Sequence, residues 1–174
     1  MQSHSSKESD DEEYSEISLR PFNISDTDDF MVWATDEKVT KYCTWEPYTS
    51  KQEALNYINN TIIPHPWYRA ICLQNRPIGS ISVAINSGNR TELGYVLAYK
   101  YWGKGIVTKA VKLMGKIIFS DFPGLERVEA LVDDENVGSQ RVLEKAGFTR
   151  EGVLIKEVIK GRSRDMVMFS LLSF

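Results

Sequence analysis

The sequence predicts one α+β domain behind a short acidic tail. Its 174 residues suit a single domain, and 42% hydrophobic with 26% charged residues is the composition of a globular protein, not of a disordered or coiled-coil chain. Several short segments alternate hydrophobic and polar residues, as strands do, and others have hydrophobic residues at helical spacing. Together they predict the order β, α, α, β, β, β, α, β, α, β, β.

The first 16 residues differ in composition from the rest. They contain six acids, one lysine and almost no hydrophobic side chains, so residues 17–174 carry a formal charge of +2 although the whole chain carries −3. Because such a segment cannot offset its ordering entropy by burial, we expect a disordered acidic tail over 1–16 and one domain over 17–174. The acidity also argues against an organelle transit peptide.

Several protein classes are excluded by pattern. The longest apolar runs fall far below the ~20 residues of a membrane helix, and the start lacks a signal region. Cys43 and Cys72 are far apart, which predicts neither a disulfide framework nor a metal site. The low charge of residues 17–174 and the lack of aromatic and basic interleaving argue against nucleic acid. The chain fits the reducing cytosol or nucleus, and we expect a cytoplasmic protein.

The first elements are a strand and two helices. Ile17 and Leu19 alternate into a strand that Pro21 ends. Ser25, with Asp28 three residues later, predicts the start of a helix. Ser50 and Glu53 form a capping box for a second helix, which Pro64 and Pro66 end. The hydrophobic residues of the two helices are Phe30, Met31 and Trp33, then Leu55, Tyr57, Ile58 and Ile62.

An antiparallel meander of three strands follows. The strands are predicted over 68–73, 78–85 and 91–97, because each segment is rich in hydrophobic residues and bounded by turn residues. The predicted turns are 75–77 and 86–90. Short turns of this kind join antiparallel neighbours.

After Leu97 the hydrophobic period becomes helical. A glycine-rich entry at 103–105 leads into a long helix, and residues 121–124 turn the chain into a strand over 128–132. Asn136 then caps a short helix, and Gly147 supplies its left-handed C-terminal residue so that Phe148 folds back on Leu143. Strands over 153–159 and 166–172, separated by 161–164, form a closing hairpin. The long helix carries Ile106, Ala110, Leu113, Met114 and Ile117.

Two joins between a strand and a helix have the chemistry of an anion site. At 97–108 the glycines open a helix N-terminus, where unpaired N–H groups and a partial positive charge attract phosphate. The segment matches neither a P-loop nor a dinucleotide fingerprint. At the second join, Asn136 and Ser139 lie three residues apart on one face of a helix start. Ordinary packing and capping explain either join alone, whereas together they suit an extended phosphorylated ligand.

At this point the chain resembles the GNAT superfamily of acyl-CoA N-acyltransferases, within it the branch of the ribosomal-protein alanine N-acetyltransferases. The resemblance extends from about residue 17 to the end. It implies a mixed central sheet of about seven strands, splayed in the middle, with helices on both faces. The matching stretches are Glu92-Leu93-Gly94-Tyr95-Val96-Leu97, Tyr101-Trp102-Gly103-Lys104-Gly105-Ile106-Val107-Thr108-Lys109-Ala110 and Asn136-x-x-Ser139-x-x-x-Leu143-Glu144-Lys145-x-Gly147-Phe148.

The resemblance implies an acetyl-CoA site. The Val96 and Leu97 backbone would pair with the pantetheine arm, and an N–H of one of them would stabilise the oxyanion. Asn136 would bind the arm, and Ser139 would donate a proton to the departing thiolate. Unlike other branches, this chain has no tyrosine after Asn136 in the helix. The amides expected to hold the pyrophosphate belong to Gly103, Lys104, Gly105, Val107 and Thr108.

A base is also required, because an ammonium group cannot attack the thioester. Glu92 is the first choice, since by alternation it shares a face with Gly94 and Val96 on the strand that would hold the oxyanion amide. The alternative is a solvated strand carboxylate. Asp133, Asp134 and Glu135, near the second join, are read as a solvated turn or an attraction for a cationic acceptor.

The expected function is an acetyl-CoA-dependent N-acetyltransferase that transfers acetyl directly to a primary amine, either a protein N-terminus or a small molecule. The alternative is a noncatalytic acetyl-CoA sensor or scaffold of the same fold. Hydrolysis by a cysteine nucleophile is disfavoured, because neither cysteine lies on a join. The acceptor, and the choice between monomer and homodimer, stay open.

Overall fold

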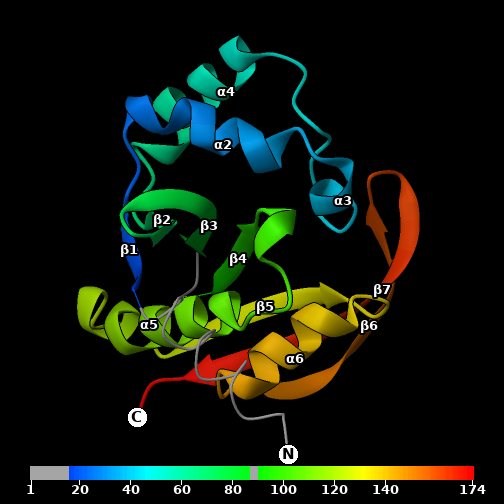
Figure 1. Ribbon diagram of the computed structural model, residues 1–174. Coiled ribbons are helices and arrows are strands. Elements are labelled where there is room, and N and C mark those ends of the chain that lie inside the picture. Colours follow the sequence, from blue (N-terminus) through cyan, green and yellow to red (C-terminus); the bar gives the residue numbers. More distant parts are fainter. Residues whose placement is uncertain (1–15, 87–89) are drawn as a thin grey trace, which may run out of the picture.

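The computed structural model describes residues 16–86 and 90–174, so the predicted acidic tail lies outside the described residues except for Glu16. Seven strands of the described part form one sheet in the order β1-β2-β3-β4-β5-β7-β6 (Figure 1). They are β1 (Ile17–Pro21), β2 (Tyr68–Leu73), β3 (Arg76–Ile85), β4 (Thr91–Leu97), β5 (Arg127–Asp133), β6 (Thr149–Ile159) and β7 (Arg162–Leu172). The predicted α+β class and mixed seven-stranded sheet are confirmed.

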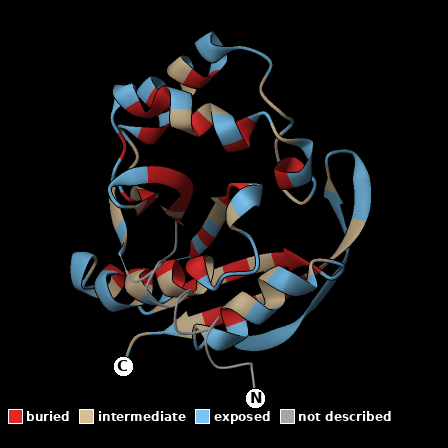
Figure 2. Ribbon diagram, viewed as in Figure 1, coloured by how far each residue is buried: buried red, intermediate tan, exposed pale blue. Residues whose placement is uncertain are grey.

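The helices form a layer on each side of the sheet (Figures 1 and 2). The α-helices are α2 (Thr27–Ala34), α3 (Glu37–Thr40), α4 (Lys51–Tyr57), α5 (Ile106–Asp121) and α6 (Val137–Lys145). One hydrophobic cluster lies beneath α2 and α4 and includes Trp33 and Ile58, while another beneath α5 and α6 includes Met114 and Leu143. Among the described residues, no helix is long and apolar enough to cross a membrane.

The sheet is divided between β4 and β5. These two strands are parallel and share a single registered pair, Glu92 with Glu129, whereas every other neighbouring pair of strands is antiparallel and paired over at least five residues. Beyond Glu92 the two strands diverge, which opens a gap between the carboxyl ends of β4 and β5 (Figure 1). This gap is the predicted splay of the sheet.

The alternation of side chains gives the two faces of the sheet different contents. Leu93 and Leu97 of β4 pack in the cluster beneath α5 and α6, whereas Val96 packs in the cluster beneath α2 and α4. Because Glu92 pairs with Glu129, the set Glu92, Gly94 and Val96 shares its face with Glu129, Leu131 and Asp133. We call the face that carries Val96 the α2 face, and the face that carries Leu93 and Leu97 the α5 face.

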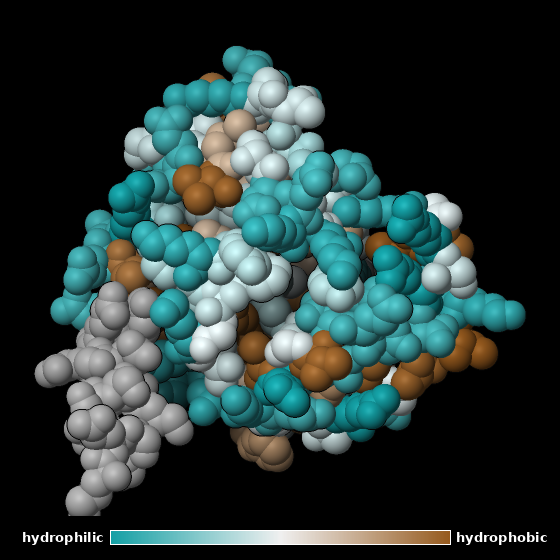
Figure 3. Space-filling model, turned by 45° about the vertical axis from the view of Figure 1, so that its right-hand side comes forward, coloured by the Kyte–Doolittle hydropathy of each residue, from teal (hydrophilic) through white to brown (hydrophobic). Residues whose placement is uncertain are grey.

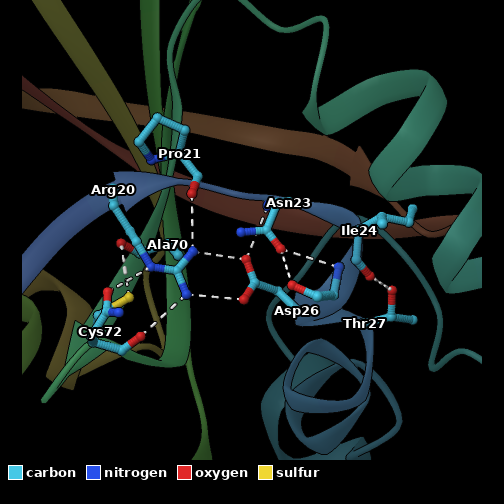
Figure 4. A network of polar contacts seen from close by, with 10 residues as sticks. Arg20, Pro21, Asn23, Ile24, Asp26, Thr27, Ala70 and Cys72 are labelled. Atoms are coloured by element: carbon cyan, nitrogen blue, oxygen red, sulfur yellow. Dashed lines mark hydrogen bonds and ion pairs between the residues drawn. The ribbon is translucent and has the colours of Figure 1, made fainter.

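The first helix begins differently from the prediction. Asn23, rather than Ser25, is the N-cap, and a 3₁₀ turn over Ile24–Asp26 precedes α2. Asp26 accepts hydrogen bonds of 2.8 and 2.9 Å from Arg20 and of 3.0 Å from the Asn23 N–H (Figure 4). Burial opposes the carboxylate charge, but these hydrogen bonds outweigh it and lower the pKa of Asp26. The pair therefore ties β1 to the start of α2.

Two hairpin turns are shorter than predicted. The β2–β3 turn consists of Gln74 and Asn75, with φ of 49° and 64°, and the β6–β7 turn consists of Lys160 and Gly161, with φ of 51° and 71°. Positive φ at both central residues is the type I′ geometry that matches strand twist. Pro77 consequently lies inside β3, at a register shift opposite Cys72.

Three smaller differences concern the connections. A one-turn helix, α3, was not predicted, nor was the 3₁₀ turn at Tyr99–Tyr101 between β4 and the glycine entry to α5. Strand β6 begins earlier than predicted and contains two register shifts, at Arg150/Gly152 and Leu154/Glu157. The end of α6 matches the prediction, because the Phe148 N–H donates to the Leu143 carbonyl at 3.0 Å.

Strand β3 approaches β4 closely at Gly79, and this contact generates a testable prediction. A Cβ there would overlap the Val96 carbonyl oxygen and lie 3.0 Å from the Leu97 Cα, whereas a Cβ at Gly94 would meet only Ser82 Oγ at 3.6 Å. We expect Gly79→Ala to lower the free energy of unfolding by about 1–3 kcal/mol, as overpacking does, and Gly94→Ala to cost less. Denaturant unfolding measures both, and equal losses would contradict the close approach.

Candidate functional site

The gap exposes one edge of β4. The Ala98 N–H donates to the Ile78 carbonyl of β3 at 2.9 Å, so by antiparallel alternation Val96 also directs its N–H and C=O toward β3. Leu97 directs its backbone the opposite way, and its carbonyl accepts a 2.8 Å hydrogen bond from Trp102 Nε1. Of the two amides in the sequence prediction, the Leu97 N–H is the one that faces the gap.

The N-terminus of α5 has open backbone donors. Gly103 and Gly105 have φ of 74° and 76°, and no atom lies within 4 Å of a Cβ built at either, so the backbone conformation rather than packing requires glycine. The first intrahelical bond runs from the Lys109 N–H to the Gly105 carbonyl, which leaves the N–H groups of Val107 and Thr108 without helical partners. No side chain caps the helix, and its first turn contains no acid. Lys104 is exposed between the two glycines.

Helix α6 begins on the same side of the sheet. The Asn136 side-chain oxygen accepts a 3.2 Å hydrogen bond from the Ser139 N–H, so Asn136 is the N-cap as predicted. Its amide nitrogen donates no hydrogen bond within the described part of the chain. Asn136 can therefore cap the helix with one atom and contact a ligand with the other.

Tyr95 is a site residue that the sequence reasoning missed. Its hydroxyl contacts Ser139 Oγ across the gap and also donates to the Ser139 carbonyl at 3.3 Å. Burial raises the pKa of Tyr95 to about 12, and the hydrogen bond with Ser139 opposes that rise, so the phenol is protonated near neutral pH. Alternation, which puts Tyr95 on the α5 face with Leu93 and Leu97, is the signal that could have identified it.

Glu92 lies on the other face of β4. It is exposed, and its carboxylate forms no ion pair or hydrogen bond among the described residues. The adjacent carboxylate on that face, Glu129, accepts hydrogen bonds from Arg127 at 2.9 Å and from Arg90 at 3.2 Å. Glu92 precedes Leu97 by five residues, about 16 Å of strand, so its route to the Leu97 amide requires water. Tyr95 and Glu92 thus face opposite sides of the sheet.

The other acids near the gap have structural partners or lie in solvent. Asp133 is buried, lies 3.4 Å from Arg164 Nη1 and accepts the Glu135 N–H at 2.9 Å. Arg164 also pairs with Glu135 at 3.1 Å. Asp134 is exposed. Asp133 therefore holds Arg164 in place, whereas the carboxylates of Glu92 and Asp134 form no ion pair or hydrogen bond among the described residues.

A cavity of about 410 Å³ lies on the α2 face, at the end of the gap. It is bounded by α3 with the loop that follows it and by the β6–β7 hairpin, which are joined by a 2.9 Å hydrogen bond from Lys160 to the Thr40 carbonyl. Figure 3 turns this side forward and shows mainly hydrophilic side chains. The lining residues are Glu37, Thr40, Lys41, Tyr42, Glu46, Pro47, Asp133, Ile159, Lys160, Arg162, Arg164 and Met166.

Neither cysteine has the properties of a nucleophile. Cys72 is buried in the sheet, and burial raises the pKa of Cys43 to about 11, although Lys160 acts in the opposite direction. Both thiols are therefore protonated near neutral pH. Among the residues that the structure describes, no group of three or more metal-ligating side chains comes together.

Comparisons with known proteins agree with this architecture. Residues 16–149 match the family model of the acetyltransferase (GNAT) domain. An uncharacterized N-acetyltransferase p20 of Bacillus licheniformis is 32% identical over 165 residues, which cover 90% of this chain and 92% of that protein. A GNAT-family acetyltransferase structure from Bacillus anthracis has a TM-score of 0.80 and 26% identity, covering 90% of this chain and 94% of that one.

Two solved structures with bound ligands share the fold. The spermidine N-acetyltransferase of Vibrio cholerae in complex with CoA and spermine has a TM-score of 0.78 at 24% identity, over 91% of this chain and 96% of that chain. RimL, a ribosomal alpha-N-protein acetyltransferase in complex with coenzyme A, has a TM-score of 0.77 at 23% identity, over 90% and 93%. Since the family model covers most of the chain and the p20 protein nearly all of it, the chain belongs to the GNAT family of N-acetyltransferases.

Proposed function

We propose that the chain transfers acetyl from acetyl-CoA directly to a primary amine of a protein N-terminus or a small molecule. The observation that supports this most is that the groups bordering the gap lie in two sets, on opposite faces of the sheet. The open N-terminus of α5 and the Tyr95–Ser139 pair lie on one face, and Glu92 and the cavity lie on the other. A thioester on the first face can thus meet an amine on the second.

The coenzyme would bind along the α5 face. The N–H groups at 103–105 and those of Val107 and Thr108 would hold the pyrophosphate, because they combine open donors with the positive end of a helix. The pantetheine arm would add to the exposed edge of β4 beside Val96 and Leu97, as an extended ligand adds to a strand, and would contact the Asn136 amide.

The chemical step would use three groups: one that stabilises negative charge, one that accepts a proton and one that donates a proton. The Leu97 N–H would stabilise the oxyanion of the tetrahedral intermediate, since it faces the gap. Glu92 would take the ammonium proton through water. Ser139 would donate a proton to the departing thiolate, with the Tyr95 hydroxyl holding it and able to replace that proton.

The first prediction tests the pyrophosphate site. Gly105→Asp should raise the acetyl-CoA Kd about tenfold or more, because a carboxylate would face the phosphates, whereas Gly105→Asn should change it less. Asn and Asp have similar shape and both tolerate the left-handed conformation of this position, so charge is the difference between them. Calorimetry on the folded variants measures Kd, and equal affinities would place the pyrophosphate elsewhere.

The second prediction tests Glu92 as the base. Glu92→Gln should reduce kcat at neutral pH, within the ~10²- to 10⁴-fold range of acid–base catalysis, and activity should recover as rising pH deprotonates the amine itself. Glu126→Gln, which changes an exposed acid at the far end of β5, should match the wild type. The measurement is a pH–rate profile with one amine. Parallel profiles for Glu92→Gln and wild type would remove Glu92 from the mechanism.

The third prediction separates the members of the Tyr95–Ser139 pair. Ser139→Ala should lower kcat by up to ~10²- to 10⁴-fold with a smaller change in KM, because the proton donor is lost. Tyr95→Phe keeps the ring and removes only the hydroxyl, so a smaller loss of kcat is expected. A Ser139→Ala variant in which KM alone changes would show that Ser139 binds and caps without donating a proton.

The assay for the function itself is release of free CoA thiol from acetyl-CoA in the presence of N-terminal peptides, polyamines and aminoglycosides. Release that depends on an added amine, with acetylated amine as product, supports the proposal. Tight acetyl-CoA binding without release from any amine would instead favour the noncatalytic sensor.

A further inference from the structure

The cavity on the α2 face has a charge balance that bears on the acceptor. It opens at the end of the gap, on the face of Glu92, and so lies where the acceptor approaches if the proposed function holds. Its lining contains four cationic side chains and three acidic ones. The lining is therefore net positive by one charge.

The acids of the lining are mostly neutralised by its own cations. Asp133 pairs with Arg164 at 3.4 Å, and Glu46 pairs with Lys160 at 3.6 Å. Arg164 and Lys160 are held further, by Glu135 at 3.1 Å and by the Thr40 carbonyl at 2.9 Å. Two of the three acids thus have a cation beside them before any ligand arrives.

The remaining charges of the lining favour an anion. Within residues 16–86 and 90–174, neither Arg162 nor Lys41 forms an ion pair or a side-chain hydrogen bond. The Lys41 Nζ lies over the ring of Tyr42, 5.0 Å from its centroid. Glu37 is the one acid of the lining without an ion pair in that part of the chain. Arg162 and Lys41 are both exposed and lie on opposite walls of the cavity, so both can contact the same ligand group.

From this balance we infer that the acceptor is a primary amine that also carries an anionic group, which Arg162 and Lys41 bind while the amine reaches the gap. The guanidinium of Arg162 suits a carboxylate or phosphate, because it presents paired N–H donors. A polyamine fits poorly, because Arg162 and Lys41 would repel its second and third ammonium groups. Of the acids in the lining, Glu37 alone would be available to attract them, since the other two already pair with cations.

The test compares acceptors that differ only in charge, and it rests on the proposed function. The acceptor pairs are two hexapeptides with Asp or Asn at the second position, and β-alanine with β-alaninamide; spermidine is the polycation. We expect kcat/KM for the anionic member of at least one pair to exceed its neutral partner by about tenfold or more, and to exceed that for spermidine. The pair that shows the preference indicates whether the acceptor amine belongs to a peptide or to a small molecule.

The variants connect this preference to the cavity. Arg162→Glu should abolish the preference for the anionic member, and Arg150→Glu, which reverses an exposed charge on β6 outside the cavity, should keep it. Three results would each overturn the inference and leave the proposed function standing. They are equal rates within both acceptor pairs, a faster reaction of spermidine, and a preference that Arg162→Glu leaves unchanged. Absence of thiol release with every amine would overturn both.

Discussion

Within the described residues, a single registered pair joins the strand ladders of the two halves of the sheet. Because β4 and β5 share only the registered pair of Glu92 and Glu129, each half has its own ladder of antiparallel strands, and the two strands diverge beyond that pair. The gap is therefore a consequence of where pairing stops. It leaves the Leu97 amide without a neighbouring strand, and Gly79 keeps this part of β4 in place by letting β3 approach its backbone.

The strand that borders the gap also separates the groups proposed for the two proton transfers. Alternation of side chains along β4 directs Glu92 to one face and Tyr95 to the other, although only three residues separate them. In the proposed reaction a proton leaves the amine on one side and another reaches the thiolate on the opposite side. In that proposal the sheet would keep base and acid from neutralising each other, and water would connect Glu92 to the thioester.

Features that depend on neighbouring residues could be predicted from the sequence. The caps at Ser50 and Asn136, the left-handed Gly147 and the glycine entry to α5 all follow from local backbone chemistry. The contact of Tyr95 with Ser139 could not be predicted from local patterns, because it joins positions 44 residues apart and exists only once β4 and α6 are placed. Asn23 was missed as a cap for a different reason: its capping box with Asp26 is local, but Ser25 is also a residue type that caps helices.

The outer edges of the sheet differ from the inner one in their capacity to accept another strand. The edge strand β6 is interrupted by two register shifts and by Lys156 at a φ of 57°, and the opposite edge, β1, has only five residues and ends in proline. Irregular or short edges resist intermolecular pairing, which protects a sheet from aggregation. The regular backbone edge that remains lies inside the molecule, along β4. Strand-like addition is thus discouraged at the perimeter and permitted along β4, within the gap.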